Sequence, residues 1–120
     1  MLSTFQLIQL CGFSFLLAVG QILFKLAAMS APALNSLQSV LSLTGNAWFW
    51  AAMGVYTCTT LLWINALQSV PLSIAYPFIA LGFIFVPLAA MFLFNEPLGL
   101  KYVIGVLLIL IALRLITTGQ

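Results

Sequence analysis

Four long apolar stretches, separated by short polar segments, dominate this sequence of 120 residues. A helix needs roughly 20 mostly apolar residues to cross the hydrocarbon core of a bilayer. Hydrophobic residues make up 65% of the chain and charged residues only 3%, whereas about a quarter of the residues of a soluble domain are charged. We therefore predict an all-α, multi-pass membrane protein. The composition excludes a water-soluble globule, a disordered chain and, at a net charge of +2, a nucleic-acid partner.

The polar breaks between the stretches set the predicted arrangement of the spans. Two breaks, Gln68–Pro71 and Asn95–Pro97, are short, so consecutive spans must run antiparallel. The longer connection, residues 30–46, has leucines and a valine at helical spacing, which predicts a short helix in the bilayer interface. Asn46 or Thr44 is expected to cap the second span. The whole chain, residues 1–120, is predicted to be one domain whose spans cover about residues 5–28, 48–67, 72–94 and 98–117.

The first span carries a polar face. Gln21 and Lys25 lie on it one turn apart, in line with Ser14 and Ala18. Such a stripe packs against neighbouring helices or lines a cavity. Lys25 has two interpretations that the spacing leaves open. It is a topology anchor whose amine reaches the headgroups, or it is the counter-charge for an anionic phosphate headgroup.

The second span offers a second polar face, made of Tyr56, Thr60 and Trp63. We expect these side chains to form a wall that faces a substrate. The alternative for the threonine is hydrogen bonding between helices, which is common in membranes. The alternative for Trp63 is an aromatic belt at the membrane surface, and its position near the end of the span favours the belt.

Helix-breaking residues mark the third span, where Pro77, Gly82 and Pro87 fall within about ten residues. Prolines free backbone carbonyls and bend a helix, and discontinuous helices are the moving parts of many transporters. We therefore predict a conformational hinge at these three residues. The alternative is a static kink that only fits the bundle.

Small residues on the fourth span predict a subunit interface. Gly105 and Ala112 are one heptad apart, and Leu108 and Ile109 lie between them on the same side of the helix. Small residues let a second helix approach closely. Because four helices enclose little volume, we expect a dimer.

The chemistry that this sequence can supply is limited. It has no histidine and one acidic residue, Glu96, which is expected to act at the positive end of the helix dipole rather than as a proton carrier. No nucleophile and base can be paired without histidine or a second acid. We predict no catalytic residue, no metal site and no cofactor, and hence a protein that is not an enzyme.

Three segments, taken in order, resemble a known family. The segments are Gly20-Gln21 followed by Lys25, Val70-Pro-Leu-Ser-Ile-Ala-Tyr-Pro77, and Glu96-Pro97 followed by Gly105–Ala112. They resemble the four-helix members of the drug/metabolite transporter superfamily. The similarity is closest to the branch with the two small subunits that flip aminoarabinose-phosphoundecaprenol.

The resemblance implies a small multidrug resistance-like bundle in the bacterial inner membrane that moves a lipid-linked phosphate or sugar phosphate. It also implies that Tyr76 faces the substrate. The small multidrug resistance exporters place a glutamate in their first span where this chain has Leu17. Proton-coupled export through that carboxylate is therefore not expected.

Together these patterns predict a flippase. Gln21, Lys25, Tyr56 and Tyr76 would bind the headgroup in a groove between two subunits, either identical or related, while the lipid tail stays in the bilayer. Two alternatives remain open from the sequence. One is a small exporter of amphiphilic or cationic compounds, and the other is a non-transporting structural subunit of a membrane complex.

Overall fold

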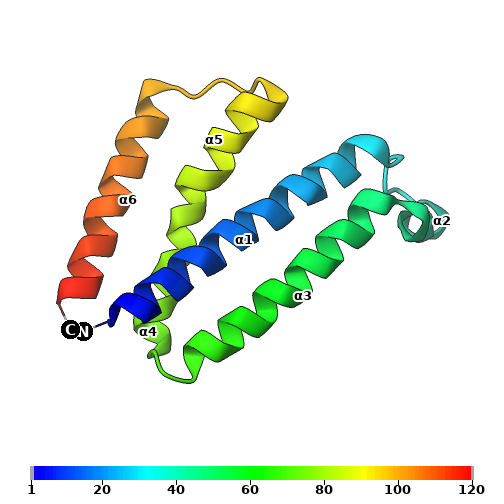
Figure 1. The fold of residues 1–120 in the computed structure, drawn as a ribbon. Helices are drawn as coiled ribbons and strands as arrows, with labels where there is room; N and C mark the ends of the chain where they lie inside the picture. The colour runs from blue at the N-terminus through cyan, green and yellow to red at the C-terminus, as the bar shows by residue number, and fades with distance from the viewer. Residues whose placement is uncertain (1, 120) are drawn as a thin grey trace.

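The computed structural model describes residues 2–119, which fold into helices joined by short connections (Figure 1). Four helical segments are long and apolar enough to cross a membrane, and the third consists of α4, η2 and α5. The predicted all-α class with four spans is therefore confirmed. The elements are α1 (Thr4–Ser30), α2 (Leu37–Leu41), the 3-10 turn η1 (Ser42–Gly45), α3 (Ala47–Leu67), α4 (Leu72–Ala75), the 3-10 turn η2 (Tyr76–Leu81), α5 (Gly82–Phe94) and α6 (Leu100–Thr118).

Local hydrogen bonds fix where the long helices begin and end. Ser3 and Gln6 form a capping box at the start of α1, with hydrogen bonds of 2.9 and 3.1 Å. The side-chain oxygen of Asn46 accepts hydrogen bonds from the first backbone N–H groups of α3, so the predicted cap of the second span is confirmed at Asn46. Asn95 ends α5 with a left-handed backbone, φ 54°, a conformation that asparagine tolerates.

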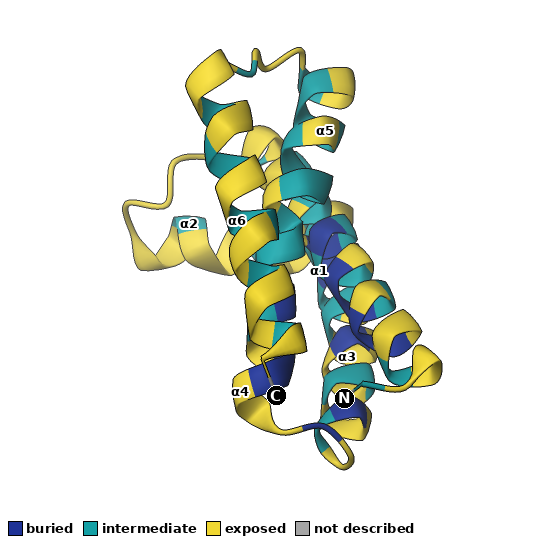
Figure 2. Ribbon diagram, turned by 90° about the vertical axis from the view of Figure 1, so that its left-hand side faces the viewer, coloured by how far each residue is buried: buried dark blue, intermediate teal, exposed yellow. Residues whose placement is uncertain are grey.

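Helix α1 is the centre of the fold. It packs along α3 on one side and against η2 and α5 on the other. By contrast, α6 packs mainly against η2 and has no buried residue. Figure 2 shows the same contrast, because dark blue buried residues lie on α1 and its neighbours, whereas α6 is mostly yellow. Helix α6, the fourth span and the predicted dimer-facing element, therefore leaves most of its surface uncovered within one chain.

One end of the molecule is tightly packed, and we call it the closed end. It contains the start of α1, the α3–α4 turn and the two ends of the described chain, which lie side by side (Figure 1). Three polar contacts join α1 to its neighbours here. Gln6 donates to Ser69 at 3.3 Å, Gln9 donates to Asn65 at 2.5 Å, and the Ser14 hydroxyl donates to the carbonyl of Phe78. The core cluster at this end is Leu10, Ala66, Val70, Ile74, Ala75 and Phe78.

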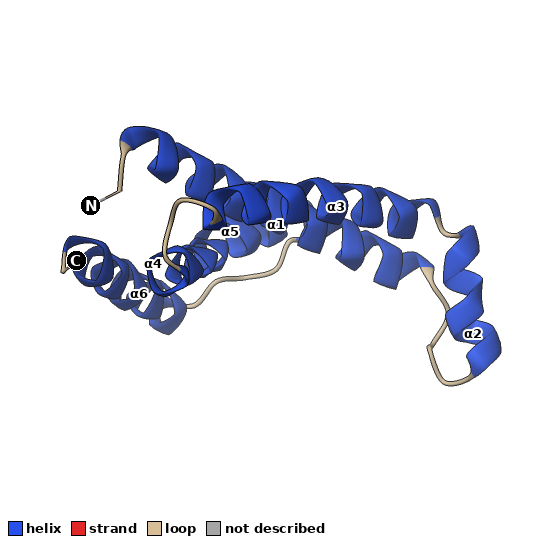
Figure 3. Ribbon diagram, turned by 90° about the horizontal axis from the view of Figure 1, so that it is seen from below, coloured by secondary structure: helices blue, strands red, loops and turns tan. Residues whose placement is uncertain are grey.

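The opposite end is looser, and we call it the open end. It holds the end of α1 with Lys25 and the connections 31–46 and 95–99. Toward this end α5 diverges from α1 (Figure 1). The connection that carries α2 extends sideways from α1 and α3 (Figure 3). The short helix predicted in this connection is confirmed as α2, whose Leu37 is 75% exposed; its place at the bilayer interface stays a prediction.

Candidate functional site

Two cavities flank the contact between α1 and η2, near the middle of the spans. The first, which we call the α1–α3 cavity, has a volume of about 360 Å³. The second, which we call the α1–α5 cavity, also has a volume of about 360 Å³. The α1–α3 cavity is lined by Phe13, Leu17, Tyr56, Thr59, Thr60, Trp63, Leu72, Tyr76 and Ile79. The α1–α5 cavity is lined by Ser14, Leu17, Ala18, Gln21, Ile79, Gly82, Phe83, Val86 and Pro87.

The α1–α3 cavity gathers four of the six residues predicted to bind substrate. Tyr56, Thr60 and Trp63 come from one face of α3, and Tyr76 reaches the same cavity from the first residue of η2. The Trp63 indole stacks on the Phe13 ring, with centroids 4.5 Å apart. Trp63 therefore packs against α1 inside the chain, a contact that an aromatic belt does not require.

A hydrogen bond connects the two cavities at the open-end side. The Gln21 amide, which lines the α1–α5 cavity, donates to the Tyr56 hydroxyl at 2.8 Å. The Tyr56 ring can lie this close to α1 because residue 20 is glycine. A Cβ at Gly20 would be 3.0 Å from Cδ2 of Tyr56, which is too close without movement of the ring. The glycine thus sets the position of a predicted substrate-facing residue.

Lys25 lies apart from both cavities. It follows Gln21 by one turn of α1, toward the open end, and it is exposed. It lines neither cavity. The structure therefore places the predicted counter-charge outside both cavities, and its role in binding a headgroup stays a prediction.

The third span changes from α-helix to 3-10 helix and back where the sequence predicts a hinge. Pro77 lies in η2, Gly82 is the first residue of α5, and Pro87 lies inside α5. Gly82 and Pro87 line the α1–α5 cavity, whereas Pro77 does not. The Phe78 carbonyl within the broken segment accepts the hydrogen bond from Ser14, which is how broken helices in membranes satisfy their backbone. Whether the segment moves stays a prediction.

The four residues of the predicted dimer interface lie along one side of α6, because they are spaced three or four residues apart in a regular helix. Leu108 is 62% exposed, and Ala112 is also exposed. Ile109 and Gly105 are half-buried, yet a Cβ at Gly105 would meet nothing within 4 Å. This surface is therefore open to a second helix, and its role in a dimer stays a prediction.

Glu96 does not act on the helix dipole as the sequence suggested. It is exposed and lies in the 95–99 connection, three residues before Gly99, which is the N-cap of α6. No acidic residue lies in the first turn of α6, and the dipole acts only over that turn. The expectation failed because the connection is one extended segment, so α6 begins later than Glu96-Pro97 implied.

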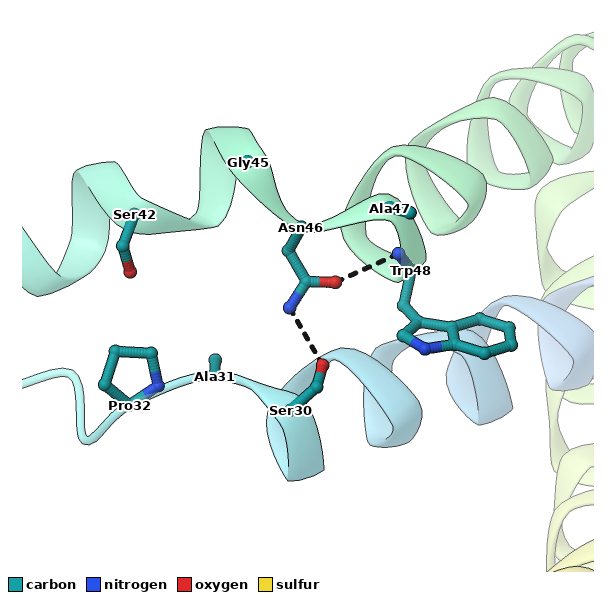
Figure 4. Close-up of a pocket in the computed structure, with 8 residues that line it drawn as sticks. All are labelled: Ser30, Ala31, Pro32, Ser42, Gly45, Asn46, Ala47 and Trp48. Atoms are coloured by element: carbon teal, nitrogen blue, oxygen red, sulfur yellow. Dashed lines mark hydrogen bonds between the residues drawn. The ribbon is translucent and has the colours of Figure 1, made fainter.

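A hollow of about 380 Å³ lies at the open end, between the connection 31–46 and the start of α3. Figure 4 shows Asn46 at its centre, where the side-chain amide donates to the Ser30 hydroxyl at 3.0 Å and the oxygen caps α3. Both hydrogen bonds drawn there involve the Asn46 side chain and serve to hold the end of α1 and the start of α3 in place. We therefore interpret this hollow as structural.

Sequence reasoning missed the apolar half of the site. Leu17, Ile79, Phe83 and Val86 line the cavities, but apolar residues in a membrane span carry no signal that separates a cavity wall from a lipid-facing surface. The Gln9–Asn65 pair was also missed, although each residue is a polar group within a span. Among residues 2–119, no group of three His, Cys, Asp or Glu residues is placed to hold a metal ion.

Four membrane-length helical segments, the third containing a 3-10 stretch beside a hydroxyl-lined cavity, describe a small multi-pass membrane protein. Comparison with known proteins gives a narrower assignment. The chain is similar to the probable 4-amino-4-deoxy-L-arabinose-phosphoundecaprenol flippase subunit ArnE of Enterobacter sp. (strain 638), with 45% identity over 71 residues, covering 58% of this chain and 66% of the relative.

The subunits of the same name from two other bacteria are also similar. The chain is 39% identical to that of Klebsiella pneumoniae (strain 342), over 59% of this chain and 65% of the relative. It is 42% identical to that of Erwinia tasmaniensis, over 52% of this chain and 57% of the relative. The chain thus spans between about half and two thirds of the length of the relatives it matches. No protein-family model matches it, and no solved structure matches it significantly.

These similarities confirm the resemblance to the small subunits of the aminoarabinose lipid flippases. Together with the four spans, they identify a multi-pass protein of the bacterial inner membrane. The relatives are named as subunits of a transport protein rather than as enzymes.

Proposed function

We propose that this chain is a flippase subunit that moves a lipid-linked sugar phosphate across the inner membrane. The observation that carries the proposal is the convergence of Tyr56, Thr60, Trp63 and Tyr76 on one cavity beside a broken span. Hydroxyl and indole groups suit the hydrogen-bonding surface of a sugar. The relatives' names specify an amino sugar on undecaprenol phosphate, and that chemistry fits the cavity.

In this mechanism the headgroup passes through the protein while the lipid tail stays in the bilayer. The hydrogen bond between Gln21 and Tyr56 connects the two cavities, and these two side chains would bind the sugar in turn as it moves along α1. Lys25, exposed one turn beyond Gln21, would attract the phosphate at the open end. Bending at Pro77, Gly82 and Pro87 would open the two sides of the membrane in turn. No step needs a catalytic residue, a metal or a cofactor, so we propose that the chain is not an enzyme.

A partner subunit completes the proposed groove. The exposed side of α6, with Gly105, Leu108, Ile109 and Ala112, is where we place a second copy or a related small subunit. Replacing Gly105 with leucine should abolish association measured by energy transfer between labelled chains, because the added side chain blocks a close helix approach. Gly54→Leu is the matched control, since a Cβ at Gly54 also meets nothing within 4 Å. Unchanged association in Gly105→Leu would place the interface elsewhere.

The function is tested by transbilayer movement in proteoliposomes. The amino group of the lipid-linked sugar is followed with a membrane-impermeant amine reagent, which reacts only with headgroups in the outer leaflet. Gln21→Leu and Lys25→Ala should abolish translocation and leave expression intact. Matched controls are Gln38→Leu and Lys101→Ala, which change the same residue types at exposed positions away from the cavities.

Three outcomes separate the alternatives. Unchanged translocation in both Gln21→Leu and Lys25→Ala would overturn the proposed site. A chain that is inert alone, but co-purifies with a partner that transports the lipid without it, would indicate a structural subunit. Efflux of cationic compounds without lipid movement would indicate a small exporter.

A further inference from the structure

Leu17 and Ile79 are the two residues that line both cavities. Leu17 comes from the middle of α1 and Ile79 from η2, and both are half-buried. Because this pair forms part of the wall of each cavity, it separates the two cavities. We call the pair the partition. The hydrogen bond from Ser14 to the carbonyl of Phe78, the residue next to Ile79, holds α1 against η2 beside the partition.

The cavities on the two sides of the partition differ in chemistry. Only two polar side chains line the α1–α5 cavity, and each donates a hydrogen bond within the chain: Ser14 to the carbonyl of Phe78, and Gln21 to the hydroxyl of Tyr56. The remaining lining side chains of that cavity are apolar or glycine. It therefore presents an apolar surface, which favours hydrocarbon over polar groups.

The α1–α3 cavity presents unused hydrogen-bonding groups. Its lining includes the hydroxyls of Thr60 and Tyr76 and the indole N–H of Trp63. No hydrogen bond joins these three groups to another residue within 2–119, whereas the Thr59 hydroxyl in the same lining donates to the carbonyl of Val55 at 2.7 Å. This cavity can therefore offer a polar ligand several donors and acceptors.

The two cavities also differ in their route to the bilayer. The α1–α5 cavity lies between α1 and the first turns of α5, and α5 diverges from α1 beyond it (Figure 1). Phe83, which lines this cavity, is 52% exposed, so a hydrocarbon chain could reach the cavity from the membrane. Each cavity lies at the lower end of the volume range of ligand sites, about 300–1,000 Å³, so each holds only part of a lipid-linked sugar.

We propose that one amphiphile occupies both cavities at once, with its sugar in the α1–α3 cavity and the first units of its hydrocarbon chain in the α1–α5 cavity. This two-cavity binding mode rests on the proposed flippase function. The molecule would cross the partition beside the Gln21–Tyr56 hydrogen bond, and the size of Leu17 would keep hydrocarbon out of the sugar cavity. Leu17 is thereby a specificity-determining residue.

Trp63 supplies a built-in reporter for this arrangement, because it lines only the sugar cavity. Replacing Trp48 and Trp50 with phenylalanine leaves it as the single tryptophan; neither replaced residue lines either cavity. The full chain is placed in nanodiscs with two short-chain polyprenyl-phosphate amino sugars. One carries a nitroxide quencher on the sugar, and the other carries it on the first isoprene unit. Binding of each is measured separately by equilibrium dialysis.

We expect the sugar-labelled probe to quench Trp63 several-fold more strongly than the chain-labelled probe at equal occupancy. Leu17→Ala should raise quenching by the chain-labelled probe close to that of the sugar-labelled one. The control Leu16→Ala makes the same change at a neighbouring residue of α1 that lines neither cavity. It should leave the ratio of Trp63 quenching by the sugar-labelled probe to that by the chain-labelled probe unchanged.

Two different results would overturn the proposal, and they can be told apart. The partition would be overturned if both probes bind but quench Trp63 equally in the unaltered chain. It would also be overturned if Leu17→Ala does not change the ratio of quenching by the two probes. Either result would leave the proposed flippase function standing. Probes that do not bind in the dialysis measurement would overturn the proposed function and the partition with it.

Discussion

The closed and open ends of this protein are built from the same spans but are held together differently. At the closed end, six core residues and three polar contacts fix α1 to α3, α4 and η2. At the open end, one hydrogen bond joins Gln21 of α1 to Tyr56 of α3, and another joins Ser30 of α1 to Asn46, the N-cap of α3. Helix α5 diverges from α1 toward this end (Figure 1). A small helical membrane protein can thus concentrate its stability at one end. Under the proposed function, this would leave the other end able to rearrange around a headgroup.

The largest expected effect tests the closed end directly. Leu10 is fully buried in the core cluster, so Leu10→Ala leaves a cavity and should lower the free energy of unfolding by about 2–5 kcal/mol. Leu93 makes the matched comparison at the open end, because it is 62% exposed. Leu93→Ala should change stability by less than about 0.5 kcal/mol. Reversible unfolding in detergent measures both, and equal losses would remove the distinction between the ends.

A second test locates the boundary between the two ends. Gly20→Leu places a side chain where the Tyr56 ring now lies 3.0 Å from the ideal Cβ position, and overpacking of this kind should cost about 1–3 kcal/mol. Gly12→Leu is the control, because nothing lies within 4 Å of its Cβ position. Translocation should fall with Gly20→Leu as well, since Tyr56 moves. If the two glycine variants unfold at the same denaturant concentration, the Tyr56 ring does not pack tightly against α1 at Gly20.

A third, smaller effect concerns the polar contact inside the broken span. Ser14→Ala removes the donor to the Phe78 carbonyl, and hydrogen bonds between helices in membranes are worth about 0.6–1.7 kcal/mol. Thr57→Ala should cost less, because the Thr57 hydroxyl is exposed and donates within its own helix. The same unfolding measurement compares the two. A loss in Ser14→Ala no greater than that in Thr57→Ala would show that this contact does not stabilise the closed end.

The smallest expected effect is at Glu96, in the open-end connection. Because Glu96 is exposed and outside the spans, Glu96→Gln should change stability by less than about 0.5 kcal/mol. It should also leave the pH dependence of translocation unchanged. The rate is measured over a pH series in proteoliposomes. Loss of pH dependence would make Glu96 a proton carrier and favour the exporter alternative.

The sequence predicted the parts of this structure that depend on composition and local chemistry. Apolar length predicted four spans, and the cap of the second span was expected at Asn46 or Thr44. Pro77 lies in the 3-10 stretch of the third span and Gly82 begins α5, whereas Pro87 lies inside that regular helix. Helical spacing also predicted that Tyr56, Thr60 and Trp63 share a face, and they line one cavity. These properties are set within a single helix, so periodicity is enough to find them.

Properties that depend on which helices meet were not predictable. Nothing in the sequence pairs Gln9 with Asn65 or Ser14 with the Phe78 carbonyl, because those contacts depend on how α1 is rotated against α3 and η2. Leu17 and Ile79 gave no signal for the same reason, since any apolar residue suits both lipid and a cavity wall. Glu96 was misplaced because a dipeptide motif does not reveal how long an extended connection will be.

The side-by-side position of the two chain ends, described above for the closed end, bears on how two copies can be arranged (Figure 1). A short covalent tether from residue 119 of one copy to residue 2 of the next would keep both copies in the same orientation across the bilayer. A tether that contains one additional membrane-crossing helix would force them into opposite orientations. If the proposed dimer forms, the two fusions would distinguish a parallel from an antiparallel arrangement, because only the fusion with the correct orientation should transport.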